Sequence, residues 1–282
     1  MGCGRLDENQ EAIEIFVAAC LSLFSSLIIF LICVCSKILE DFSRKILFYI
    51  SLNSIIRSMI MILSVNSDFR NLCFIFAYVN MVCLVSNVIW ALSISITLYM
   101  VLVRKEENFQ KYHLRWLICA YLPVALLLLL PYITNSYGVT RGICALDYNM
   151  ISTIWDLILV YLPSWFMIFS VLIIYIKLYY YVKKSVDIKF KSILIERGMI
   201  YSILIALAIL PVTIWRTLSI FYSSCGMSYF RIIALSIIHM QGVYYLIAVT
   251  MNNKIRKAII LKIYKRNHEH MISLSGESFF LA

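Results

Sequence analysis

The sequence predicts an all-α membrane protein: a bundle of seven transmembrane helices with a short amphipathic cytoplasmic helix after the seventh span. Hydrophobic residues make up 62% of its 282 residues and charged residues 14%, whereas soluble domains average about 45–50% and 25%. A soluble core of this size cannot bury so much apolar surface, so lipid must cover the remainder. Seven apolar stretches each reach the ~20 residues that a helix needs to cross a ~30 Å hydrocarbon layer. They run from 12–36, 45–66, 73–103, 113–133, 153–180, 193–222 and 229–251.

Lysine and arginine concentrate in every second gap between these stretches, which gives the chain a direction. Nineteen of the 25 basic residues fall in that set of gaps or in the ends of the stretches that border them. Because basic residues are retained on the cytoplasmic side, we expect the amino terminus outside and the carboxyl terminus inside, with the plasma membrane as the location. The same pattern accounts for the net charge of +10, so we expect no nucleic-acid partner.

The chain is expected to divide into four segments. Residues 1–11 form an extracellular tail, 12–251 the seven-transmembrane domain, 252–266 a juxtamembrane helix and 267–282 a disordered cytoplasmic tail. In 252–266, isoleucines recur at four-residue spacing among lysines and arginines. Such a helix lies on the anionic inner leaflet without crossing it, so membrane lipids are expected partners.

Two of the nine cysteines are predicted to lie on the oxidising outer side. Cys73 opens the third apolar stretch, and Cys144 lies in the loop between the fourth and fifth. A bridge between them would tie that loop over the top of the third helix, and we favour it over the alternative of two free thiols. Cys3 and Cys225 have no assigned partner.

Ionisable residues inside apolar stretches need a partner or a purpose. Those considered for a functional role are Arg57 in the second, Asp156 in the fifth, Arg216 in the sixth and His239 in the seventh. Asp156 and Arg216 lie at similar depth near the outer ends of consecutive helices. They are predicted either to form an ion pair or to line a cavity that opens outward.

Aromatic residues in the same outer half complete a candidate ligand pocket. Trp155 and Trp215 flank the two charged residues, and Tyr78 lies in the third stretch. Aromatic rings with a few charges around a concavity are typical of small-ligand sites. For any single residue, the simpler interpretation is an interfacial aromatic ring or a snorkelling arginine.

A second group, nearer the inner side, is predicted to pack helices together or to switch between two arrangements. Asn53 in the second stretch and Gln241 in the seventh are amides that can join helices at roughly 1 kcal/mol each. Gly242 indicates a close helix approach, and Trp90 lies in the third stretch. Pro211 removes a backbone hydrogen bond from the sixth helix, where it acts either as a hinge or only as a structural kink.

Motifs of catalysis are absent from the sequence. It contains no nucleotide-binding loop, no His or Cys cluster with metal-ligand spacing, and no nucleophile with an evident base. We therefore expect that the protein is not an enzyme and that it has no cofactor and no metal site.

Two segments resemble one family of membrane proteins. Ser43-Arg-Lys-Ile-Leu-Phe-Tyr-Ile-Ser-Leu-Asn53 resembles the entry to the second span of the cyclic-AMP-type chemoattractant receptors of slime moulds, which are G-protein-coupled receptors. The segment 240–253, Met-Gln-Gly-Val-Tyr-Tyr-Leu-Ile-Ala-Val-Thr-Met-Asn-Asn, resembles the Gln-Gly segment that these receptors share with the secretin and adhesion group. Trp90, Trp116 and the Cys73 and Cys144 pair also lie where that superfamily places them.

The resemblance implies a receptor that senses an extracellular ligand and signals to a cytoplasmic heterotrimeric G protein. It does not identify cyclic AMP as the ligand, and the third and seventh spans lack the Asp/Glu-Arg-Tyr and Asn-Pro-x-x-Tyr motifs of rhodopsin-like receptors. The residues expected to face the G protein are Arg104, Lys105, Lys183, Lys184, Lys254 and Arg256.

Two other functions stay open at this point. In a seven-span transporter or channel, the ionisable residues inside the spans would line a path or a proton relay. An intramembrane enzyme is disfavoured, because the spans lack a plausible catalytic dyad.

Overall fold

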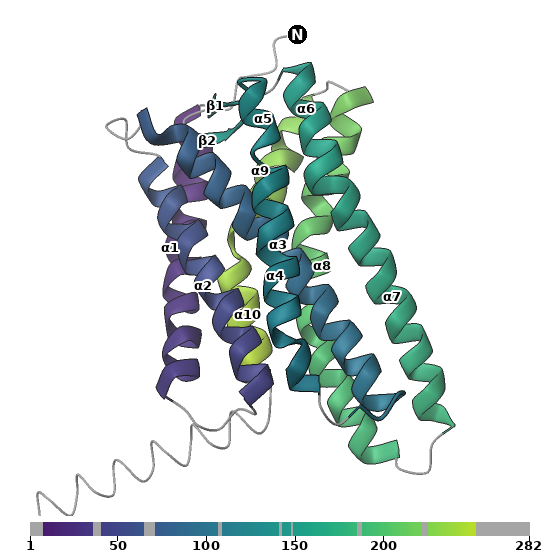
Figure 1. The fold of residues 1–282 in the computed structure, drawn as a ribbon. Coiled ribbons are helices and arrows are strands. Elements are labelled where there is room, and N and C mark those ends of the chain that lie inside the picture. Colours follow the sequence, from purple (N-terminus) through teal and green to yellow (C-terminus); the bar gives the residue numbers. More distant parts are fainter. Residues whose placement is uncertain are drawn as a thin grey trace, which may run out of the picture.

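The computed structural model describes residues 8–35, 41–64, 71–106, 109–140, 143–147, 149–184, 188–221 and 225–251. Long helices run side by side along most of these residues (Figure 1). The first four long helices are α1 (Glu8–Cys35), α2 (Asp41–Ser64), α3 (Cys73–Leu102) and α4 (His113–Leu127). The later ones are α7 (Leu162–Lys183), α8 (Ile188–Phe221), α9 (Cys225–His239) and α10 (Gln241–Met251). Shorter elements are η2 (Phe109–Tyr112), α5 (Leu130–Ile133) and α6 (Met150–Asp156).

Six helical segments are long and apolar enough to cross a membrane, and these correspond to the first six predicted spans. They are Ala12–Val34, Arg44–Ser64, Cys73–Leu102, His113–Ile133, Met150–Tyr181 and Ile200–Leu218. Large apolar side chains such as Phe24 on α1 and Phe166 on α7 point out of the bundle, as lipid contact requires. These features are those of a helical integral membrane protein.

The prediction of a single helix for the seventh span, 229–251, is wrong. The segment is broken into α9 and α10, which are inclined to each other by 51°. The break falls at Met240, immediately before Gln241 and Gly242, and glycine is a common position for a sharp kink. The bundle contains seven spans if this bent pair counts as one.

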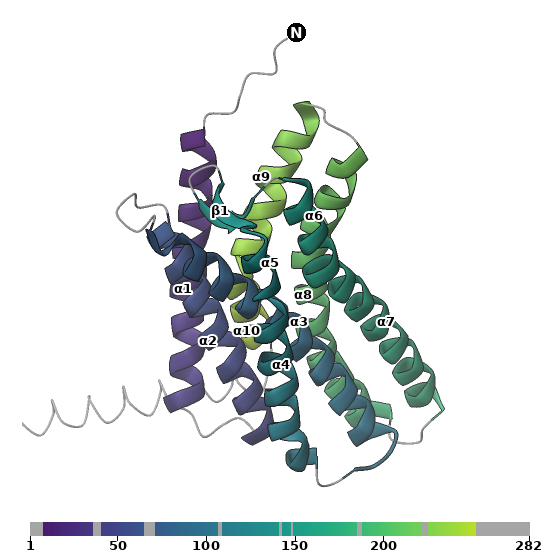
Figure 2. The ribbon, with the colours of Figure 1, turned by 45° about the horizontal axis from the view of Figure 1, so that its top comes forward.

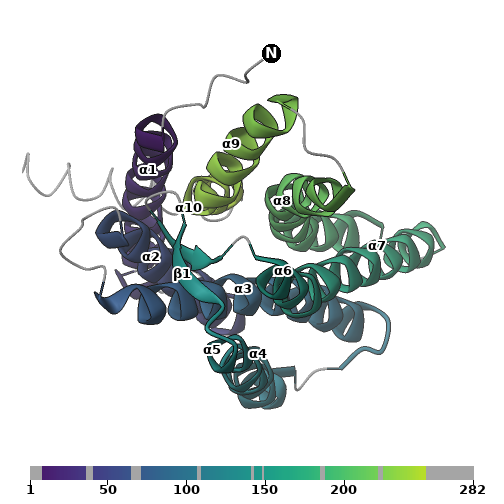
Figure 3. The ribbon, with the colours of Figure 1, turned by 90° about the horizontal axis from the view of Figure 1, so that it is seen from above.

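The helices surround α3, which is the most enclosed of them. In the most apolar part of α3, 72% of the residues are buried, against 22% in α4. Viewed along the bundle, α4 lies outside and packs on α3, while α1, α9 and α8 lie on the opposite side (Figure 3). The largest buried cluster accordingly includes Trp90 of α3 and Tyr245 of α10.

A small β-hairpin, which the all-α prediction missed, lies at one end of the bundle. Strands β1 (Tyr137–Thr140) and β2 (Ile143–Leu146) pair antiparallel, with Val139 opposite Cys144. The two strands contact α3 (Figure 2), and Figure 3 shows them lying across the bundle. We name this end the hairpin end, and the end formed by the last turns of α3 and α7 the basic end.

The fifth span changes its winding immediately after Asp156. Residues Leu157–Tyr161 (η3) form a π-helical turn between α6 and α7. Pro163 follows two residues later, and the backbone N–H of Leu162 bonds to the carbonyl of Leu157, five residues back. A proline ring clashes with the carbonyl four residues before it in a regular helix, so the wider turn accommodates Pro163 without breaking the span.

Several predictions concern residues outside the described part of the chain. The amphipathic helix at 252–266, the tail at 267–282 and residues 1–7 are among them, with Lys254, Arg256 and Cys3. Glu8 already belongs to α1, so this helix begins within the segment expected to be a tail.

Candidate functional site

A cavity of about 80 Å³ lies inside the bundle beneath the hairpin. Its walls come from α2, α3, η3, α7, α8 and α9, and strand β2 contributes Ile143 and Ala145. Most of the wall is apolar, with Arg57, Asn80, Arg216 and His239 as its charged or strongly polar members. Small-ligand sites have the same chemistry, an apolar wall with a few convergent polar groups, although they are usually larger, at ~300–1,000 Å³. The other lining residues are Met61, Met81, Leu84, Val160, Tyr161, Ser164, Ile209, Val212, Trp215, Leu235 and Ile238.

The disulfide between Cys73 and Cys144 fixes the hairpin above this cavity. The two sulfur atoms are at bonding distance, 2.14 Å, and both side chains are buried. Tyr137 of β1 also donates its hydroxyl to the carbonyl of Leu128 at 2.8 Å, and burial raises the pKa of this phenol, so it remains a donor. The predicted bridge is therefore present, and it joins β2 to the start of α3.

Asp156 and Arg216 form an ion pair at the cavity wall. Their Oδ2 and Nη2 atoms are 3.1 Å apart, and the side chains are only 2% and 12% exposed. The guanidinium also lies over the ring of Trp215, 4.7 Å from its centroid. The ion-pair interpretation is therefore the correct one. Arg216 also lines the cavity, whereas Asp156 does not.

Tyr78 and Trp155, the other predicted pocket residues, face α4 and α5 instead. Tyr78 donates its hydroxyl to the carbonyl of Ala125 at 3.0 Å, and Trp155 donates its indole N–H to Thr134 Oγ1 at 2.9 Å. Neither residue lines the cavity. Depth in the membrane was readable from the sequence, but the rotation of a nearly uniformly apolar helix about its axis was not.

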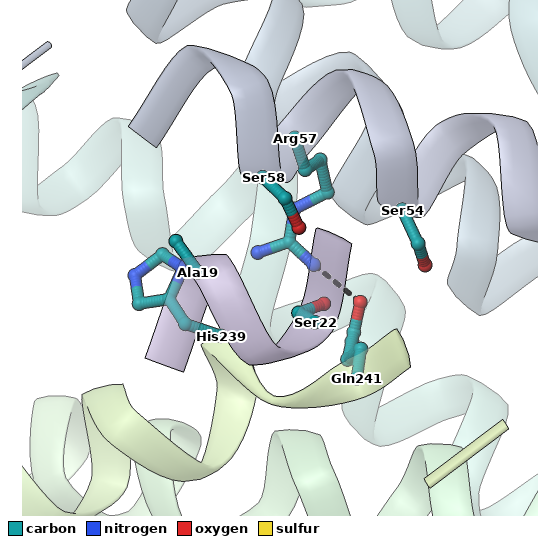
Figure 4. Close-up of a pocket in the computed structure, with 7 residues that line it drawn as sticks. All are labelled: Ala19, Ser22, Ser54, Arg57, Ser58, His239 and Gln241. Carbon is teal, nitrogen blue, oxygen red and sulfur yellow. Dashed lines mark hydrogen bonds between the residues drawn. The ribbon is translucent and has the colours of Figure 1, made fainter. Parts of the chain in front are cut away.

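Arg57 lies at the floor of the cavity, in the centre of a polar network. Its Nε donates to Asn80 Oδ1 at 3.2 Å, and its Nη1 donates to Gln241 Oε1. Figure 4 shows the guanidinium reaching from α2 between Gln241 and the imidazole of His239. The network thus connects α2 and α3 with the break between α9 and α10.

Three further hydrogen bonds carry this network toward the basic end. Asn87 donates to Gln241 Oε1 at 3.4 Å and accepts from Asn53 Nδ2 at 2.9 Å. Asn53 in turn accepts from the hydroxyl of Tyr121 on α4 at 2.9 Å. Trp90 packs beside this network, and its ring centroid lies 6.5 Å from that of Tyr121. The expectation that Asn53 and Gln241 join helices is thereby met.

Gly242 is the point where α10 touches α1. A Cβ atom built there would lie 2.3 Å from the backbone oxygen of Ser22 and 2.3 Å from Ser26 Oγ. The backbone N–H of Gly242 also bonds to Ser22 Oγ at 3.0 Å. The close approach predicted from the sequence is present, and only glycine fits it.

Gly242→Ala is expected to lower the free energy of unfolding by about 1–3 kcal/mol, because α10 must move off α1 to admit the methyl group. The measurement is the thermal unfolding midpoint of purified protein. Gly138→Ala is the matched control, because nothing lies within 4 Å of a Cβ placed at that glycine. Equal midpoints for the two variants would show that α1 and α10 are not in close contact.

A hydroxyl cluster that the sequence did not reveal joins three helices below Pro211. Ser95 Oγ on α3 lies 3.0 Å from Ser202 Oγ on α8, and Tyr175 of α7 donates to Ser202 Oγ at 3.3 Å. Pro211 lies inside α8 between this cluster and Arg216. A hinge at Pro211 would therefore separate the cavity-lining part of α8 from the part held by the cluster.

Four of the basic residues expected to face a partner are exposed at the basic end. Arg104 and Lys105 follow the end of α3, and Lys183 and Lys184 lie at the end of α7. Nearby, Glu106 forms a hydrogen-bonded ion pair of 2.8 Å with Lys111, which raises the pKa of that lysine. The other two basic residues expected to face a G protein, Lys254 and Arg256, lie outside the described residues.

Within the described ranges, no group of three or more His, Cys, Asp or Glu side chains is placed to hold a metal ion. Neither a family model nor a curated protein matches the sequence. The likeness to G-protein-coupled receptors therefore rests on the residues quoted above.

Proposed function

We propose that this protein is a G-protein-coupled receptor that binds an extracellular ligand in the cavity beneath the hairpin. The observation that carries the proposal is the cavity itself, which is covered by a strand tied to α3 through Cys73 and Cys144. On the orientation expected from the basic residues, this cavity lies on the extracellular side.

The walls of the cavity supply a route for coupling. Trp215 and Arg216 line it from α8, and the Ser95, Tyr175 and Ser202 cluster holds the same helix nearer the basic end. A ligand that binds better when α8 is displaced would shift the population toward that state. The G protein would then dock at the basic end, on a surface that includes Arg104, Lys105, Lys183 and Lys184.

One observation favours the second candidate, a transporter or channel. The break between α9 and α10 lies beside the buried Arg57 and His239, and broken helices next to polar groups are typical of transporter binding sites. Solute flux distinguishes this candidate from a receptor.

The cavity proposal is tested by filling the cavity. Cells that express the protein are screened with extracellular ligands in a calcium or cyclic-nucleotide readout, and the active ligand is then applied to Ala145→Trp. Because Ala145 lines the cavity from β2, we expect at least a tenfold loss of potency. Val139→Trp is the matched control, since Val139 lies on the same hairpin and is exposed. An unchanged dose response in Ala145→Trp would place the ligand elsewhere.

A further inference from the structure

A second, much smaller chamber lies beside Arg57, next to the main cavity. Its volume is about 10 Å³, which is space for one water-sized particle. It is lined by residues of α1, α2 and the α9–α10 break, which Figure 4 shows around the Arg57 guanidinium. They are Ala19, Ser22, Ser54, Arg57, Ser58, His239 and Gln241.

The charge in this chamber is positive and lacks a counter-charge. Arg57 is 5% exposed, and its hydrogen bonds run from Nε to Asn80 and from Nη1 to Gln241, both of which are neutral amides. Among the described residues, no carboxylate lies within ion-pair distance of Arg57, while the buried Asp156 pairs with Arg216. A buried, unpaired cation is costly in a medium of low dielectric constant.

The chamber also presents hydrogen-bond donors without acceptors. The Nε2 amide of Gln241 and the hydroxyl of Ser54 are buried and have no hydrogen-bond partner among the described residues. The hydroxyl of Ser22 accepts the N–H of Gly242, so its own proton is available to donate. In addition, α10 begins at Gln241, which directs the positive end of that helix dipole toward the same point.

We infer that this chamber binds a single monatomic anion, of which chloride is the natural occupant. Such an ion fits a volume close to that of one water molecule, whereas a carboxylate or phosphate group is too large for it. It would neutralise Arg57 and accept hydrogen bonds from Ser54, Ser22 and Gln241 Nε2. A water molecule would fill the same space but leave the charge of Arg57 unbalanced.

Bound anion would also fix the α9–α10 break against α1 and α2. Arg57 and Ser54 come from α2, Ser22 from α1, and Gln241 from the first residue of α10. The ion would therefore stabilise the folded bundle whether or not the protein is a receptor. This independence separates the test from that of the proposed function.

The experiment measures the thermal unfolding midpoint of the purified full-length protein in lipid nanodiscs, without ligand or G protein. Chloride replaces gluconate at constant ionic strength, because gluconate is too large for the chamber. We expect a saturable rise of about 5–10 °C at chloride concentrations roughly a hundred times the Kd. Bromide should substitute for chloride, and binding should broaden the chloride NMR line in a way that bromide reverses.

Two variants locate the effect. Arg57→Gln should abolish the chloride-dependent rise, and Ser54→Ala, which keeps the charge of Arg57, should raise the Kd for chloride about tenfold or more. Ser51→Ala is the matched control, since Ser51 is a buried serine one turn away on α2 whose hydroxyl bonds to the carbonyl of Phe48. Should Arg57→Gln fail to fold, the comparison of Ser54→Ala with Ser51→Ala still decides.

Two results would overturn the inference. The first is an unfolding midpoint that is the same in chloride and in gluconate, as a chamber holding only water would give. The second is the same chloride Kd in Ser54→Ala and Ser51→Ala.

Discussion

Arg216→Ala is expected to lower the free energy of unfolding by about 3–5 kcal/mol, because it leaves the carboxylate of Asp156 buried without its partner. That carboxylate is 2% exposed and 3.1 Å from Arg216. The sequence left open whether Arg216 pairs with Asp156 or lines an open cavity. Because the ion pair is present, thermal unfolding must be measured before any dose response is interpreted.

The double variant Arg216→Met with Asp156→Asn is the decisive comparison. Because it removes both charges, it should recover much of the stability that Arg216→Ala loses. Arg104 is exposed at the basic end, so Arg104→Ala should not change the unfolding midpoint beyond experimental error. If the double variant is as unstable as the sum of its single changes, the two charges do not interact.

Cys73→Ser and Cys144→Ser should each lower the free energy of unfolding by about 2–5 kcal/mol, and the double variant should be no worse than either one. The bridge spans 71 residues of sequence, and cross-links over long loops constrain the unfolded chain most. The expected loss therefore belongs to one bond, which a single substitution already removes. The measurement is thermal unfolding with and without a reductant.

The reductant supplies the internal control for this series. It should destabilise the natural protein and leave the three serine variants unchanged. Cys119→Ser, at an exposed cysteine of α4, should behave like the natural protein. A double variant clearly less stable than both single variants would contradict the bridge.

The sequence predicted the parts of the fold that depend on length and hydropathy. The first six spans follow from apolar stretches, since a helix must satisfy its own backbone hydrogen bonds in lipid. The Cys73 and Cys144 pair followed from the side of the membrane on which each was expected. Asp156 and Arg216 could be paired because their depths on consecutive helices were readable.

Features that depend on rotation or on local backbone geometry were not predictable in this way. Tyr78 and Trp155 lie at suitable depth but point toward α4 and α5, and a helix that is apolar all round carries little information on which face turns inward. The hairpin was missed because each strand has four residues. Val139, Thr140 and Ile143 around Gly142 were the available strand and turn signal.

The break before Gln241 shows how a polar network can override an apolar pattern. The stretch 229–251 reads as one span, yet Gln241 bonds to Arg57 and Asn87. Gly242 at the same point has a low helix propensity and packs directly on α1. The sequence predicts packing or switch roles for both residues. It does not show which residues they contact in three dimensions, and these contacts determine where the helix axis bends.

Nucleotide exchange on a heterotrimeric G protein is the most direct test of the receptor proposal. The purified protein is reconstituted in liposomes with G protein and an active ligand, and exchange is measured beside solute flux in the same vesicles. The receptor account predicts ligand-dependent exchange that is lost in Ala145→Trp and retained in Val139→Trp, with no flux. Ligand-independent solute flux without any nucleotide exchange would contradict it.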